Sequence, residues 1–110
     1  MRLPILAIAL LLAAASPAPA AQSIVGTWAT PGRCGRPLST IVVSPMALAG
    51  EDFFCDFTEV SRKDDTVRWR GICTFGVDEE KAVVTARLER GRLSYQFHRD
   101  GWNGPLQRCR

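Results

Sequence analysis

The fold is decided by residues 53–75, which read FFCDFTEVSRKDDTVRWRGICTF. Apolar and polar side chains alternate on both sides of a charged centre, and a period of two indicates β-strands. A hairpin centred on Asp64 gives three matched pairs: Phe57 with Gly71, Cys55 with Cys73, and Phe53 with Phe75. A slip of one residue would send one apolar set to solvent, so the pattern specifies the register. Glu59 opposite Trp69 is the one poor match.

A second hairpin follows in residues 81–98, around the two-residue loop Arg90-Gly91. Glycine suits this loop because hairpin loops of this length need a positive φ. The resulting register gives an apolar inner face: Leu88 with Leu93, Ala86 with Tyr95, and Val84 with Phe97. Polar pairs then face outward: Thr85 with Gln96, and Arg87 with Ser94. The two hairpins therefore specify their registers independently.

Turn signals recur about every ten residues elsewhere, as all-β domains require, and helical periodicity is nearly absent. Three further strands are expected at residues 23–30, 39–44 and 105–110. Residues 45–50 form either a short edge strand or one helical turn. We expect an all-β domain of seven or eight meandering antiparallel strands, arranged as a single small barrel or sandwich and stapled by disulfides.

The first 20 residues are typical of a secretory signal peptide. Arg2 provides the positive start, residues 3–15 are largely apolar, and the small residues Ala18 and Ala20 mark a cleavage site. Because a spanning helix needs about 20 apolar residues, we expect no membrane span. The chain therefore divides into a signal peptide, residues 1–20, and a disulfide-stapled β domain, residues 21–110, which is periplasmic or secreted.

All four cysteines follow this leader, and they allow three pairings. The hairpin register favours Cys55 with Cys73, because directly opposed residues lie about 4.5 to 5.5 Å apart at Cα, within the range of a disulfide. Cys34 would then pair with Cys109. Structural disulfides are expected, and no metal or redox cofactor, because the sequence lacks the closely spaced ligands of zinc sites and the C-x-x-C of redox motifs.

Composition and charge weaken several functional classes. The formal net charge is only +3, whereas a nucleic-acid interface usually shows a strongly basic, clustered face. His98 is the only histidine, and it is expected at a strand end, facing outward, without the nucleophile and orienting group that acyl-transfer catalysis needs. We therefore expect neither a nucleic-acid partner nor an enzyme.

Four residues are candidates for contact with a partner. Arg68 and Arg70 lie on the expected outer face, where with Arg87 they can form a basic stripe for an acidic surface; a stripe that only keeps the sheet soluble is the alternative. Phe54 and Trp102 do not fit the inward pattern of the other aromatic residues. Trp102, in a glycine-rich turn, is the first candidate for a binding hot spot, and a tryptophan folded over a barrel end is the alternative.

Gly26-Thr27-Trp28 resembles the G-x-W signature that opens lipocalin-like and avidin-like barrels, a group that includes small β-barrel protease inhibitors. The resemblance implies that Trp28 closes one barrel end and that a basic side chain, Arg108 or Arg110, packs across it by a cation–π contact. Most of residues 21–110 is similar to small uncharacterised exported bacterial proteins with a G-x-W first strand and four cysteines. The matching positions are Gly26, Trp28, Cys34, Gly50, Cys55, Cys73 and Cys109.

This second resemblance implies a fold and a compartment but no activity. We expect an exported, non-enzymatic binding module that is monomeric and whose partner is an envelope protein, for example a hydrolase that it inhibits. The alternative is a small-ligand-binding barrel of the lipocalin-like type. An enclosed apolar cavity of about 300 Å³ or more would favour the ligand carrier, whereas a core filled with aromatic side chains would favour the protein-binding module.

Overall fold

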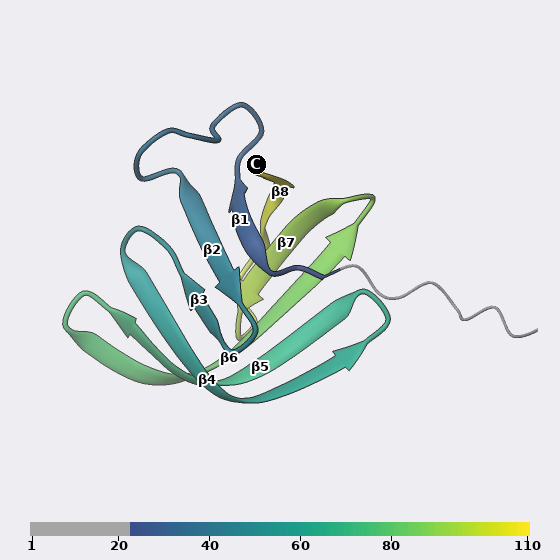
Figure 1. Cartoon of the computed structure of the whole chain (residues 1–110). Helices are drawn as coiled ribbons and strands as arrows, with labels where there is room; N and C mark the ends of the chain where they lie inside the picture. Colours follow the sequence, from purple (N-terminus) through teal and green to yellow (C-terminus); the bar gives the residue numbers. More distant parts are fainter. Residues whose placement is uncertain (1–22) are drawn as a thin grey trace, which may run out of the picture.

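A computed structural model describes residues 23–110, so the expected signal peptide lies outside the described residues. Within residues 23–110, eight antiparallel strands close into one barrel in which each strand pairs with the next and the last pairs with the first (Figure 1). The strands are β1 (Gly26–Ala29), β2 (Thr40–Ser44), β3 (Ala47–Ala49), β4 (Phe53–Lys63), β5 (Thr66–Phe75), β6 (Asp78–Glu89), β7 (Arg92–Phe97) and β8 (Asn103–Arg108). The all-β expectation is confirmed, and the architecture is a barrel. This part of the chain holds no helix long and apolar enough to cross a membrane.

Several strand boundaries differ from the sequence-based expectation: β1 (Gly26–Ala29) is shorter than the expected 23–30, and β8 covers Asn103–Arg108 rather than 105–110. The ambiguous segment 45–50 contains the short strand β3, and β6 begins at Asp78, three residues earlier than the sequence suggests. Asp78, Glu79 and Glu80 pair with the end of β5, and all three side chains are exposed. Because no apolar residue alternates with them, this part of the strand leaves no periodic signal in the sequence.

The first hairpin keeps the three expected pairs: Phe53–Phe75, Cys55–Cys73 and Phe57–Gly71. Thr58 then has no partner on β5, and the register shifts so that Glu59 lies opposite Arg70 and Val60 opposite Trp69. The expected pairing of Glu59 with Trp69 is therefore wrong. The physical reason is a β-bulge, whose extra residue changes the alternation of the strand. Because of the bulge, the Glu59 carboxylate lies opposite Arg70 instead of opposite the buried indole of Trp69.

The second hairpin has the expected register at every pair, from Val84–Phe97 to Leu88–Leu93. Arg90 and Gly91 form its two-residue loop with φ values of 52° and 78°. Both values are positive, as the loop type that matches strand twist requires. The apolar inner face expected from this register is present, since Val84, Ala86, Leu88 and Leu93 are all buried.

Aromatic rings and a disulfide fill the barrel interior. Trp28 and Trp69 are 0% and 1% exposed, and the ring of Phe57 stacks on Trp69 with the centroids 4.9 Å apart. The Trp69 indole N–H donates to the Pro45 carbonyl oxygen at 3.0 Å, so its polar atom is satisfied. Cys55 and Cys73 are both 0% exposed within the same core.

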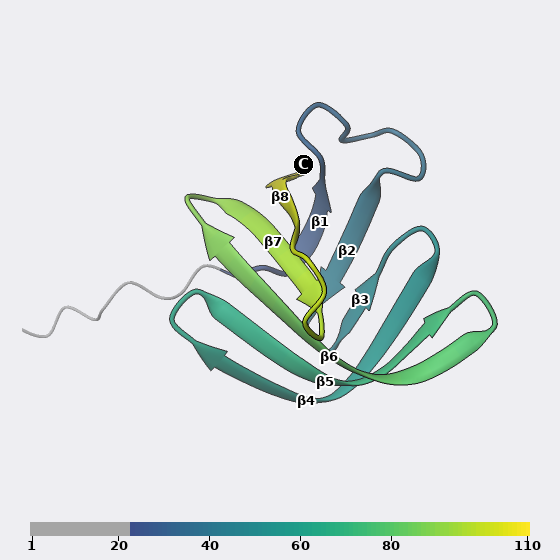
Figure 2. The same ribbon diagram turned by 180° about the vertical axis from the view of Figure 1, so that it is seen from behind.

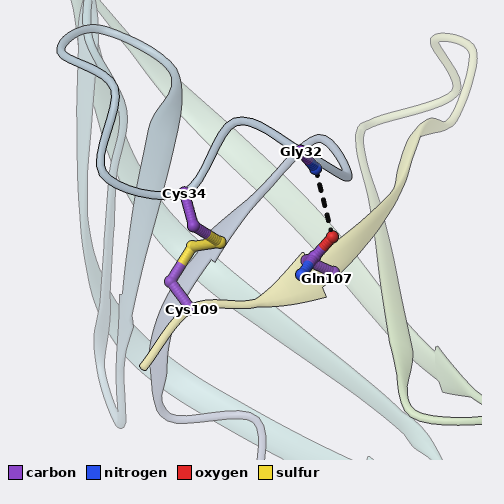
Figure 3. The surroundings of a disulfide bond; sticks show 4 residues. All are labelled: Gly32, Cys34, Gln107 and Cys109. Atoms are coloured by element: carbon purple, nitrogen blue, oxygen red, sulfur yellow. Dashed lines mark hydrogen bonds between the residues drawn. A yellow bond between two sulfur atoms is a disulfide. The ribbon is translucent and has the colours of Figure 1, made fainter.

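Both expected disulfides are present. Cys55–Cys73 joins directly opposed residues of β4 and β5 with a Cα separation of 4.0 Å. Cys34–Cys109 joins the β1–β2 loop to the C-terminal segment with a Cα separation of 5.4 Å (Figure 3). Its partners are 75 residues apart in the chain, and closing a loop of that length in the unfolded state is worth about 4 to 5 kcal/mol by chain entropy.

Gly71 lies beside the bulge, where the backbone of β4 passes close to it. A Cβ atom at this position would overlap the Asp56 carbonyl oxygen and lie 2.6 Å from the Phe57 Cα. Both obstacles are backbone atoms, so they cannot move aside as the end of a flexible side chain would. The close approach of the two strands therefore requires glycine here.

We expect Gly71→Ala to lower the free energy of unfolding by about 1 to 3 kcal/mol, because the added methyl group overpacks a backbone contact. Urea unfolding followed by circular dichroism measures this change. Gly101→Ala is the control, since a Cβ there meets no atom within 4 Å, and its effect should stay within about 0.5 kcal/mol. Equal midpoints for the two variants would contradict the close approach at Gly71.

Candidate functional site

The meander places successive loops at opposite ends of the barrel. The loops at residues 45–46, 64–65 and 90–91 lie at the end where β1 begins, and we call this the closed end. The loops at residues 30–39, 50–52, 76–77 and 98–102 lie at the other end, which we call the open end. Figure 2 shows the consequence for the longest strands, whose β4–β5 and β5–β6 hairpins extend in opposite directions.

Trp28 and Arg108 contact each other beside the segment that precedes β1. The Arg108 guanidinium lies 4.4 Å from the centroid of the Trp28 ring, and its two terminal nitrogens donate to the carbonyl oxygens of Ser23 and Val25 at 2.6 and 2.9 Å. The Trp28 indole N–H donates to the Ile24 carbonyl oxygen at 2.9 Å. Arg108 therefore holds the segment 23–25 in place. The contact implied by the resemblance is present, and Arg108 makes it.

At the open end, the loops surround a hollow of about 510 Å³. Strand side chains form its inner part: Trp28, Ile41, Phe53, Tyr95 and Leu106. Its rim comes from three separate segments and includes Arg33, Leu38, Glu51, Asp52 and Asn103. The hollow opens to solvent between these loops, so it differs from an enclosed apolar cavity.

Charge and aromatic surface meet in this hollow. Arg33 comes from the β1–β2 loop, whereas Glu51 and Asp52 come from the β3–β4 loop. Burial, and secondarily the negative charge of Asp52, raises the pKa of Tyr95 above its ordinary value of 10.0. The Tyr95 hydroxyl therefore stays neutral through the physiological range and can donate or accept a hydrogen bond. The ring of Phe53 lies beside it, with the centroids 6.5 Å apart.

The β1–β2 loop is held by several contacts although its side chains are mostly exposed. The Cys34–Cys109 bond anchors it, and the Gly32 N–H donates to Gln107 Oε1 at 3.2 Å (Figure 3). Two successive turns add backbone bonds, from Arg33 to Thr30 at 2.9 Å and from Arg36 to Arg33 at 3.1 Å. The loop presents Leu38 with 71% of its surface exposed. Such a pre-ordered loop loses little entropy on binding.

The residues that the sequence singled out for binding lie elsewhere, on the outer surface. Arg68 and Arg70 alternate with buried residues of β5 and are exposed. The Arg87 guanidinium covers the Trp102 ring at 4.5 Å from its centroid, and Trp102 is 41% exposed.

Phe54 is 50% exposed on the outer face of β4, where it pairs with Thr74. Thr74 is six residues from Arg68 along β5, a distance of about 20 Å. The structure thus places Arg68, Arg87 and Trp102 over neighbouring strands and Phe54 well away from them. None of the four candidates, Phe54, Arg68, Arg70 and Trp102, lines the open-end hollow.

His98 lies in the turn after β7, where its backbone N–H donates to the Val83 carbonyl oxygen at 2.7 Å. Its Nε2 atom is 3.8 Å from Glu80 Oε1. Among residues 23–110, no hydroxyl group makes a hydrogen bond with the ring, and all four cysteines are in disulfides. The geometry around His98 is that of an exposed surface pair.

Sequence reasoning missed the open-end residues Arg33, Leu38, Asp52 and Asn103 as a group, and placed Tyr95 only as an inward residue. The order of the strands around the barrel is the information that would have grouped these residues. In a meander, every second loop lies at the same end, so the segments 30–39 and 50–52 had to be neighbours.

No family model matches the chain, and neither does any curated protein or any solved structure. The fold and the site therefore define a class only. Residues 23–110 form a closed eight-stranded antiparallel barrel with two disulfides, a tryptophan–arginine contact and a hollow at the open end.

The pKa of Tyr95 can be measured directly, because it is the only tyrosine in the chain. We expect the tyrosinate absorbance of the folded domain to titrate above 10.0, the ordinary value that the unfolded chain should show. Native stability should accordingly fall as the pH rises past 10.0 towards the pKa of the folded state.

Asp52→Asn should lower the titration midpoint of Tyr95 because it removes a nearby negative charge. Burial of Tyr95 should still keep this midpoint above that of the unfolded chain. Glu51→Gln is the matched control, and it should leave the midpoint unchanged. Identical titrations of the folded and unfolded chain would contradict the described geometry.

Proposed function

We propose that the protein is a non-enzymatic binding module of an oxidising compartment, the periplasm or the cell exterior, and that a protein partner docks on the open end of the barrel. The observation that supports this most is the contrast between the filled interior and the ordered, exposed rim. Trp28, Phe57 and Trp69 occupy the core, so little room is left for an enclosed ligand. Binding surface is instead available at the loops.

The disulfides and the leader together support this compartment. Two disulfides are typical of oxidising environments, and the first 20 residues have the character of a signal peptide. The periplasm and the exterior both satisfy these conditions.

The rim supports a protein as the partner because it offers apolar and charged contacts on a rigid frame. Leu38 is a large exposed side chain, and Arg33 and Asp52 line the same hollow. A narrower form of the proposal is that the partner is a hydrolase that the module inhibits. A protruding loop that resists local unfolding can occupy a protease cleft without being efficiently cleaved.

A small-ligand carrier is the second candidate. The hollow of about 510 Å³ falls within the range of about 300 to 1,000 Å³ for small-molecule sites. Its charged rim and open mouth favour a polar ligand over a lipid chain.

Affinity capture from an envelope extract tests the proposal, with immobilised domain 21–110 as the bait. We expect Leu38→Asp to reduce recovery of a specific partner by about tenfold, the effect of losing a hot-spot contact. Val42→Asp is the matched control, since Val42 is 44% exposed on the outer face of β2 and does not line the hollow. It should recover the partner as the unchanged domain does.

Equal recovery with all three baits would contradict docking at the open end. Native mass spectrometry of the purified domain separates the two candidate functions. A stoichiometric bound small molecule would favour the ligand carrier.

A further inference from the structure

The β4 strand is much longer than the strand beside it. β3 pairs only with residues 54–56 of β4, while β4 continues to Lys63 in contact with β5 alone. On the side away from β5, the last backbone bond is the one from the Phe57 N–H to the Met46 carbonyl oxygen. Within the described part of the chain, residues 58–63 therefore form a free strand edge, and β4 is the outer strand of the projecting hairpin (Figures 1 and 2).

The pairing shows which backbone groups this edge presents. Cys55 and Cys73 are 4.0 Å apart at Cα, which identifies the close, non-hydrogen-bonded type of antiparallel pair. Hydrogen-bonded and non-hydrogen-bonded pairs alternate along β5, so Trp69 and Val67 also belong to non-hydrogen-bonded pairs with β4. Their partners are Val60 and Arg62. The N–H and C=O groups of Val60 and Arg62 consequently point outward, away from β5.

This edge is complementary to itself. When two copies meet antiparallel about a two-fold axis at Ser61, Val60 of each copy can exchange two backbone hydrogen bonds with Arg62 of the other. In the same register, Glu59 of each copy lies opposite Lys63 of the other, and opposite charges across strands are favourable. A shift towards the turn would place Arg62 opposite Arg62, and a shift the other way would leave Glu59 opposite Ser61.

We propose that residues 58–63 form the surface through which two copies of this chain associate, joining their sheets edge to edge across a two-fold axis at Ser61. The proposal goes beyond the binding function of the open end and uses the opposite end of the barrel. It departs from the expected monomer because the free edge is visible only once the unequal lengths of β3 and β4 are known.

A second free edge provides the contrast. β7 pairs with β6 only from Val84 onward, so residues 78–82 at the start of β6 also lack a strand partner on that side. Asp78, Glu79 and Glu80 are three consecutive carboxylates, and like charges on an edge oppose strand pairing. Of these two edges, the β4 edge is therefore the one that combines outward backbone groups with matched charges.

The edge offers six residues from each copy, whereas a standard interface has about 20 to 30 residues on each side. The association is therefore weak, and a covalent trap is the appropriate test. Ser61→Cys, made in the domain 21–110 with both native disulfides formed, places two thiols at the axis. Directly opposed residues of this type lie about 4.5 Å apart at Cα, within disulfide range. With dissolved oxygen as the oxidant, we expect disulfide-linked dimers to form at least about tenfold faster than with Glu79→Cys on the β6 edge, as read on non-reducing gels.

Charge reversal tests the register. Adding Glu59→Lys to Ser61→Cys should slow cross-linking, because it places two positive charges opposite each other, and adding Lys63→Glu as well should restore the rate. Circular dichroism checks that each variant keeps its fold. Cross-linking of Ser61→Cys no faster than that of Glu79→Cys would overturn the proposal, and so would a rate that is unaffected by reversing Glu59.

Discussion

The register of β4 against β5, locked by the buried Cys55–Cys73 bond, is the constraint on which the rest of the barrel depends. β5 pairs along its whole length with β6, so the position of β5 determines where β6 and β7 begin. A slip of one residue would turn the apolar side chains of one of the two strands outward, Phe57 on β4 or Trp69 on β5, and leave the core partly unfilled. The disulfide prevents this slip because it joins two residues that are opposed only in the native register.

The two ends of the barrel differ because the strands have unequal lengths. β1 and β3 are short, whereas β4, β5 and β6 are long and need the bulge at Thr58 and the missing side chain of Gly71 to coil closely together. The long hairpins leave a free edge near the closed end. The long β1–β2 loop, held by Cys34–Cys109, instead builds the rim of the open end. The two proposed surfaces thus share one structural origin.

Both hairpin registers could be predicted from the sequence because they depend on local information. A short loop and alternating side chains are enough to pair Leu88 with Leu93. The bulge could not be located, since the mismatch of Glu59 with Trp69 indicates an irregularity without showing which residue is extra. Asp78–Glu80 gave no strand signal because the side chains are uniformly polar.

The candidate site was harder to predict because its residues come from distant segments. Arg33, Asp52 and Tyr95 belong to three separate parts of the chain and meet only after the barrel closes. The Trp28–Arg108 contact is equally distant in sequence, yet the G-x-W resemblance implied it. The free edge of β4 depends on where β3 begins, and nothing in residues 45–50 specifies that position.

Limited reduction of the folded domain, followed by alkylation and peptide mapping, tests the central constraint most directly. Cys34 and Cys109 are partly exposed, whereas Cys55 and Cys73 are 0% exposed. We predict that Cys34 and Cys109 are labelled first, and that Cys55 and Cys73 stay bonded until the domain unfolds. Labelling of Cys55 and Cys73 at the same rate while the domain remains folded would contradict a register locked in the core.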